Sequence, residues 1–331
     1  MQNISVKLLF TLAIGFYLIT SALPAQSQDS MEGYVSKAVD EYSKGNFGQA
    51  IKLYDEAMKK FGEHPAIYVL KAEAYAKGKN DINSGKFDPN GYRLALESLN
   101  RALQLAPESP QVFQTRGKIN LVYRQFKEAV EDFTLTLKYT KDKETIYQAV
   151  SDRATAKMLS QDFDGAIQDF ESSIKMKPEN ANSYINLGGL YDMKNDHKKS
   201  EETYLKGLKY DPKNALLMNN LGFLFVRTKQ FKTALKWLNQ AIEVDPKMAY
   251  AYGNRGYSKF MLGKVAEGKK DIDIAVKIGP NNPFAFKYRA IYYIKQKEYA
   301  LACADLQKAN ELGYSQTYGD EVNNLIKKHC K

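Results

Sequence analysis

Residues 215–246 read ALLMNNLGFLFVRTKQFKTALKWLNQAIEVDP and carry two amphipathic patterns separated by the polar break RTKQ at 227–230. In each pattern, apolar side chains recur at steps of three and four residues, as on one face of an α-helix. They are Leu217, Leu221, Leu224 and Phe225 in the first pattern, and Phe231, Ala234, Leu235, Leu238, Ala241 and Ile242 in the second. The stretch therefore predicts two antiparallel helices joined by a short turn.

The same pattern recurs along the chain with a period of 34 residues. This spacing is kept by Pro178, Pro212, Pro246 and Pro280, and by Gly188, Gly222 and Gly256. It is also kept by a small residue (Ala166, Ser200, Ala234, Gly268, Ala302) and by a large one (Phe170, Tyr204, Leu238, Ile272, Leu306). Small residues let paired helices approach closely and large ones fill the gap to the next pair. The sequence thus predicts an all-α array of repeated helix pairs.

The 34-residue pattern divides most of the chain into repeats. Residues 147–316 hold five contiguous units, and residues 31–143 hold about three more. One of these three carries an 11-residue insertion within 77–92, which is rich in glycine and proline and is expected to form a loop. Residues 317–331 show a helical apolar stripe at Tyr318, Val322, Leu325 and Ile326, and predict a helix that caps the array.

The repeat resembles the tetratricopeptide repeat. The resemblance is carried by the period, by Leu-Gly with a following aromatic (Leu187-Gly188-Tyr191, Leu221-Gly222-Phe225), and by the small, large and proline positions after it. The chain departs from the family pattern in lacking the tryptophan of the first helix, since its one tryptophan is Trp237 in a second helix. The resemblance implies a right-handed superhelical α-solenoid of about eight helix pairs plus a C-terminal capping helix.

The N-terminus predicts export. Lys7 precedes an apolar run from Leu8 to Thr20, and small residues around Pro24 follow it, in the order typical of a secretory signal peptide. We expect cleavage after Ala25 or Ser27, which gives a periplasmic or secreted protein. The alternative is an uncleaved membrane anchor, but the run is shorter than a membrane-spanning helix requires. We therefore expect no membrane span after cleavage.

Charge and composition exclude several classes. With 331 residues, 44% apolar side chains and a mean hydropathy of −0.49, the chain is neither disordered nor a multi-span membrane protein. The net charge of +10 is spread along the sequence, and basic pairs lie near carboxylates, so we expect no nucleic-acid partner. The positive charge leaves open one alternative function, which is binding of an anionic cell-envelope polymer.

The two cysteines, Cys303 and Cys330, are expected to pair if the chain is exported to an oxidising compartment. The alternative is two unrelated thiols, one buried and one on a frayed tail. A Cα separation of more than about 7 Å would exclude the bridge.

No catalytic or metal-binding pattern is recognisable. His64, His197 and His329 have no metal-ligand or triad spacing, and His197 occupies a packing position of the repeat. The insertion faintly resembles a calcium loop, but Lys86 and Tyr92 stand where glycine and glutamate are required. We therefore expect no cofactor, no metal and no enzymatic activity.

The resemblance to the tetratricopeptide repeat also implies where a ligand would bind. Positions 2, 5, 6, 9, 12 and 13 of each unit would face a concave groove that takes a peptide. In this chain the candidate groove residues are Asn186, Asn220, Phe223, Asn254, Tyr257, Phe260, Lys287, Tyr288 and Ile291. The alternative is that these asparagines are merely common in such repeats and that neighbouring helices cover the aromatics. The favoured interpretation is an exported scaffold that binds a protein or peptide of unknown identity.

Overall fold

The computed structural model describes residues 29–78 and 88–330. These residues form 18 helices and no strand, which confirms the predicted all-α array of helix pairs. The expected signal peptide at 1–25 lies outside the described residues, as does most of the expected insertion loop. Among the helices described, none is both long enough and apolar enough to cross a membrane.

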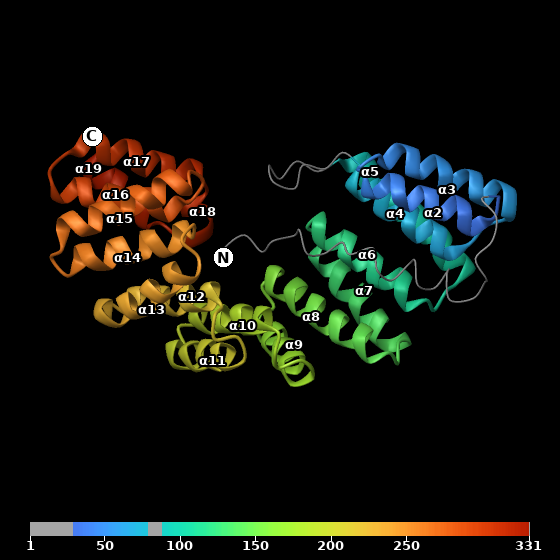
Figure 1. The fold of residues 1–331 in the computed structure, drawn as a ribbon, viewed down its shortest axis with the longest axis horizontal. Helices are drawn as coiled ribbons and strands as arrows, with labels where there is room; N and C mark the ends of the chain where they lie inside the picture. The colour runs from blue at the N-terminus through green and yellow to red at the C-terminus, as the bar shows by residue number, and fades with distance from the viewer. Residues whose placement is uncertain (1–28, 79–87, 331) are drawn as a thin grey trace. The chain divides into compact units, whose positions relative to one another are not determined.

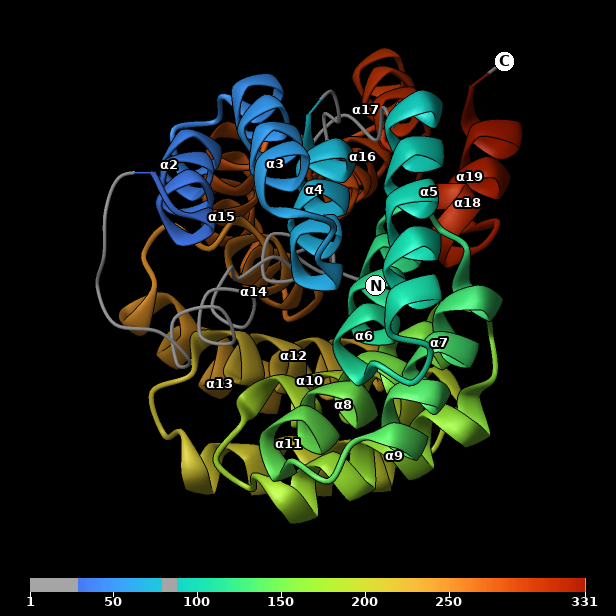
Figure 2. The same ribbon diagram turned by 90° about the vertical axis from the view of Figure 1, so that its right-hand side faces the viewer.

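The chain divides into two compact units, one ending at Ser173 and the other beginning at Ile174. The helices of the N-terminal unit stack side by side as antiparallel pairs (Figures 1 and 2). They are α2 (Met31–Ser43), α3 (Phe47–Phe61), α4 (Pro65–Lys77), α5 (Pro89–Leu105), α6 (Pro110–Val122), α7 (Phe126–Tyr139), α8 (Lys143–Leu159) and α9 (Phe163–Met176), the last of which runs into the boundary.

The C-terminal unit continues the same pattern and ends with two shorter helices (Figure 1). It comprises α10 (Ala181–Met193), α11 (His197–Tyr210), α12 (Ala215–Arg227), α13 (Phe231–Val244), α14 (Ala249–Met261), α15 (Val265–Ile278), α16 (Pro283–Lys295), α17 (Tyr299–Glu311), α18 (Tyr314–Tyr318) and α19 (Glu321–His329). The segment expected to form one capping helix thus holds the end of α18 and the whole of α19.

Helix boundaries follow local sequence signals. Asn180, Asn214 and Asn282 cap the first helices of their pairs, because each side-chain oxygen accepts a hydrogen bond from a backbone N–H in the first turn. The recurring prolines lie between the end of one pair and the start of the next, where they remove no helical hydrogen bond.

The turn inside each of the five pairs from α8–α9 to α16–α17 depends on one residue in the left-handed region. Gln161, Asn195, Lys229, Gly263 and Lys297 hold this place with φ between 58° and 82°. Four of the five are not glycine, and each stores a modest strain that the packed helices on both sides maintain.

Buried aliphatic side chains fill the core of each pair, with glycine where the helices come closest. Leu217, Leu221 and Leu238 are fully buried between α12 and α13. A Cβ atom on Gly222 would stand 2.7 Å from the side chain of Leu238, so the close approach of these two helices requires glycine there. The first helices α10, α12, α14 and α16 also contact one another in succession.

Candidate functional site

The candidate groove residues come from this row of first helices, and we call the surface that they share the first-helix face. Asn186 lies on α10, Asn220 and Phe223 on α12, and Tyr257 on α14. Ile291 lies on α16. All five side chains are only partly buried, so they remain accessible from solvent.

The asparagines of this row differ in their surroundings. Asn220 is half-buried and its side-chain oxygen accepts a hydrogen bond from Asn219 Nδ2 at 3.2 Å. Asn254 is 4% exposed, donates to Asn219 Oδ1 at 3.2 Å and accepts from the Tyr288 hydroxyl at 3.2 Å. Asn254 therefore joins α12, α14 and α16, and it has no free surface to offer a ligand.

The aromatic side chains form a continuous cluster across the same helices. Phe223 meets the ring of Phe284 edge-on at 5.4 Å between centroids. Tyr257 stacks on Tyr288 at 4.5 Å and meets Phe231 edge-on at 6.1 Å. Burial, assisted by the charge of Glu321, raises the pKa of Tyr257, so its phenol stays neutral and can donate a hydrogen bond at any physiological pH.

Lys287 and Tyr288 are covered by the C-terminal segment. Lys287 is 7% exposed, and its Nζ donates to the Tyr314 hydroxyl at 2.9 Å and to Glu321 Oε2 at 3.1 Å. The rings of Phe284, Tyr288 and Tyr314 surround the same nitrogen, with centroids at 5.3, 4.9 and 5.0 Å. Burial lowers the pKa of Lys287, and the nearby Glu321 opposes this effect.

Phe260, another candidate, also points into the protein. It is 9% exposed and its ring lies 6.0 Å from that of Tyr292 on α16. The candidates therefore separate into two groups. Five are open on the first-helix face, whereas Asn254, Phe260, Lys287 and Tyr288 are buried by contacts within the chain, because α16 and α18 pack over positions that the sequence pattern left open.

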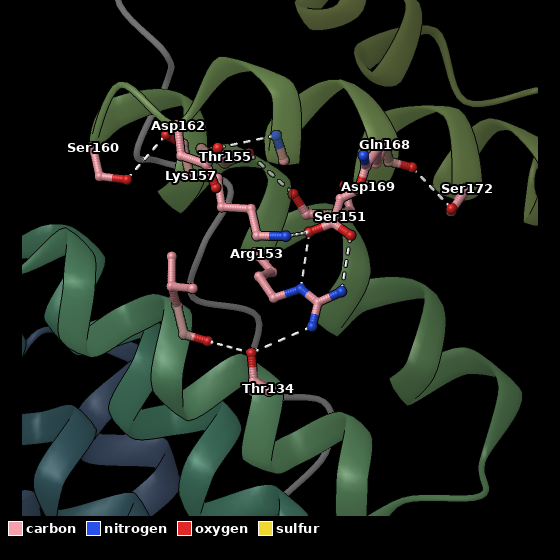
Figure 3. A network of polar contacts seen from close by, with 12 residues as sticks. Thr134, Ser151, Arg153, Thr155, Lys157, Ser160, Asp162, Gln168, Asp169 and Ser172 are labelled. Carbon is pink, nitrogen blue, oxygen red and sulfur yellow. Dashed lines mark hydrogen bonds and ion pairs between the residues drawn. The ribbon is translucent and has the colours of Figure 1, made fainter.

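A ladder of ion pairs was missed by sequence reasoning. Arg153 on α8 donates from Nε and Nη2 to both carboxylate oxygens of Asp169 on α9 at 2.8 Å. Lys157 Nζ lies 2.8 Å from the same carboxylate, and Arg153 Nη1 reaches Thr134 Oγ1 on α7 at 3.3 Å (Figure 3). The sequence signal that could have predicted these ion pairs is an arginine sixteen residues before an aspartate. It recurs in Arg116–Asp132, Arg255–Asp271 and Arg289–Asp305.

The predicted disulfide is confirmed. Cys303 on α17 and Cys330 after α19 are bonded, with their Cα atoms 5.6 Å apart. Of the residues described, no three histidine, cysteine or acidic side chains are placed to hold a metal ion. His197 Nδ1 lies 3.0 Å from Asp192 Oδ1, and Arg227 forms an ion pair with the other oxygen of Asp192, so this histidine at the start of α11 belongs to a contact that joins α10, α11 and α12.

Family models described as tetratricopeptide repeat match residues 35–81, 181–214 and 203–236. Tetratricopeptide repeat protein 13 of Homo sapiens is 30% identical over 128 residues, which cover 38% of this chain and 14% of that protein. DnaJ homolog subfamily C member 7 of Mus musculus is 26% identical over 156 residues, which cover 46% of this chain and 31% of that protein. The chain matches less than a third of the length of either relative.

Two solved structures share the fold. A tetratricopeptide repeat protein from Parabacteroides merdae ATCC 43184 has a TM-score of 0.63 at 20% identity, and the match covers 81% of this chain and 99% of that one. A chain of the APC/C hetero-tetramer Cut9-Hcn1 has a TM-score of 0.58 at 15% identity, with 94% of this chain and 58% of that one covered. At these identities the likeness concerns the fold alone.

Proposed function

We propose that this chain, three stretches of which match the tetratricopeptide repeat, is an exported, non-enzymatic scaffold that binds a protein or peptide on the first-helix face of its C-terminal unit. The observation that supports this most directly is the open set Asn186, Asn220, Phe223, Tyr257 and Ile291. These side chains lie on four neighbouring helices and remain accessible while the residues around them are buried.

The chemistry of this set suits an extended or helical peptide. Asparagine both donates and accepts hydrogen bonds, so Asn186 and Asn220 can pair with a peptide backbone. Phe223 and Tyr257 are held in place by Phe284 and Tyr288, so they offer contact area with little loss of side-chain freedom on binding.

The test is capture of a partner from cell-envelope extract by the mature chain that begins at residue 26. We expect Asn220→Ala combined with Phe223→Ala to abolish capture while circular dichroism remains helical. The control is Tyr210→Ala, which removes an exposed aromatic from the second helix α11 and should leave capture unchanged. Capture that survives the double substitution would place the binding surface elsewhere.

A salt series on the same capture separates the alternative, binding of an anionic envelope polymer. Exposed charge pairs are screened over about 8–10 Å at physiological salt, so polymer binding to the basic surface should weaken steeply between 50 and 500 mM salt, as assay conditions. Capture through contacts with amides and aromatic rings should change little over the same salt range.

Export is the second part of the proposal, and it rests on the charged, apolar and small-residue order of residues 1–25. N-terminal sequencing of the protein from its native host should begin at residue 26 or 28. A mature chain that still begins at Met1 would contradict export by this route.

A further inference from the structure

The short helix α18 lies on the first-helix face rather than beyond the end of the array. Its two tyrosines both contact Phe284 at the start of α16, with ring centroids 5.1 Å away for Tyr314 and 4.7 Å away for Tyr318. Phe284 in turn meets Phe223 of α12, one of the open residues of the proposed binding face. The chain thus places its own aromatic pair next to that surface.

The same segment supplies a carboxylate to a buried cation. Glu321 Oε2 lies 3.1 Å from Lys287 Nζ and accepts a hydrogen bond from the Tyr314 hydroxyl at 3.0 Å. Removing the segment would leave the Lys287 ammonium without its carboxylate, beside the two remaining aromatic rings of Phe284 and Tyr288. The surface under α18 therefore contacts two aromatic side chains four residues apart and an acidic side chain three residues after the second.

Glycines border α18 on both sides, and contacts to α17 hold the helix that follows it. Gly313 and Gly319 border α18 with φ of 82° and 91°, a left-handed conformation that glycine adopts without strain. Beyond α18, the helix α19 is held to α17 by the fully buried Val322, by a hydrogen bond from Asn310 to Asn323 and by the Cys303–Cys330 disulfide. The disulfide thus joins the C-terminal end of the segment covalently to α17.

We propose that α18 is a displaceable occupant of a docking site, and that the site takes a helical segment of a partner protein with the same arrangement of aromatic, aromatic and acidic side chains. This deepens the proposed function, on which it rests, by naming the chemistry of the bound segment. The site is closed while the disulfide is intact, because the covalent link keeps the competing segment at a high effective concentration.

Opening requires a dithiol reductant. The reductant transfers two electrons and two protons to Cys303 and Cys330, which become thiols, and is itself oxidised to a disulfide. The segment then remains covalently tethered only through Gly313, so its effective concentration at the site falls and a partner segment can compete for Phe284, Lys287 and Tyr288.

The test uses the full mature chain and a labelled synthetic peptide of residues 313–326, GYSQTYGDEVNNLI. We expect weak binding to the oxidised wild type and at least tenfold tighter binding to the variant Tyr314→Ala with Tyr318→Ala, whose own segment no longer competes. Replacing the peptide's acidic residue by Glu321→Gln, or the receptor's cation by Lys287→Met, should weaken that binding at least tenfold. Equal binding to all receptors, or no binding to the folded tyrosine variant, would overturn the proposal.

Hydrogen exchange of the unmodified protein gives an independent measurement that does not depend on how the variants fold. Reduction should speed exchange in residues 313–329 and leave α12 and α14 protected. Unchanged exchange in residues 313–329 after complete reduction would overturn the closure by the disulfide. Failure of the peptide experiment leaves the capture experiment with Asn220 and Phe223 unaffected, so the two proposals fail separately.

Discussion

Arg255 and Asp271 form a two-pronged ion pair between α14 and α15, with Nε and Nη2 each 2.8 Å from a carboxylate oxygen. Lys259 adds a second cation at 2.8 Å from Asp271 Oδ2. Burial by itself would raise the pKa of Asp271, but the hydrogen bonds and charges of Arg255 and Lys259 outweigh it and hold the pKa below its ordinary value. The pair therefore stabilises the folded chain with its carboxylate ionised.

Asp271→Asn should lower the free energy of unfolding by about 2–4 kcal/mol at pH 7, because it leaves the guanidinium of Arg255 and the ammonium of Lys259 without their anion. A carboxylate whose folded pKa is depressed contributes stability above its unfolded pKa, about 3.9, and loses it as the pH falls through the folded value. The difference between wild type and variant should therefore shrink below about pH 4. Urea unfolding at pH 7 and pH 3 measures it.

Asp132 provides the matched control for this measurement. It pairs with Arg116 in the same way, but Asn120 stands where Lys259 stands for Asp271. With only one cation beside it, burial dominates and raises the pKa of Asp132. Asp132→Asn should therefore cost less at pH 7, on the order of 1 kcal/mol, and the cost should not decrease in acid. Equal losses at Asp132 and Asp271 would contradict the role given to Lys259.

Alanine substitutions at Gly256 and Gly253 on α14 should change the stability of the protein in opposite directions. A Cβ on Gly256 would lie 2.7 Å from the backbone oxygen of Gly268, which has no freedom to withdraw, so Gly256→Ala should destabilise by about 1–3 kcal/mol. A Cβ on Gly253 meets nothing closer than 3.6 Å, so Gly253→Ala should stabilise by about 0.5–1 kcal/mol through helix propensity. Thermal unfolding of the two variants checks the sign of each.

The amide row contains one structural asparagine and one available for binding. Asn254→Ala should destabilise by about 1–3 kcal/mol, because the buried Asn219 oxygen and Tyr288 hydroxyl lose their partner. Asn220→Ala, at a half-buried position, should change stability by less than about 0.5 kcal/mol and act on partner capture instead. Urea unfolding and the capture assay on both single variants separate the roles; a stability loss at Asn220 equal to that at Asn254 would contradict this assignment.

The repeat period was enough to predict the fold, because each unit shows the same order of small and large residues. Gly222 and Leu238 illustrate why, since the side chain of Leu238 occupies the space that a Cβ atom on residue 222 would need. The cysteine pair was also predictable. The turn conformation was not predictable, because the left-handed region is usually signalled by glycine and is occupied here by Lys229 and Gln161.

The candidate site was predictable only in part, because position within a repeat does not say what covers a residue. Asn220 and Asn254 occupy the same place in successive units, yet only Asn254 is reached by a tyrosine of the next first helix. Lys287 and Tyr288 are buried by α18, which begins at the end of the last repeat and continues beyond it. Such contacts depend on residues 27 to 34 positions away in sequence, which a single repeat pattern does not encode.

The disulfide should make the largest single contribution to the stability of the C-terminal end. On the chain-entropy model, closing the loop from Cys303 to Cys330 stabilises the folded chain by about 3.5 kcal/mol. Reduction of the wild type should therefore lower the midpoint of thermal unfolding, whereas the variant Cys303→Ser with Cys330→Ser should unfold at that lower midpoint with or without reductant. If the wild type and the double variant unfold together under oxidising conditions, the bond adds nothing beyond the contacts of Val322 and Asn323, and α19 alone secures the end of the array.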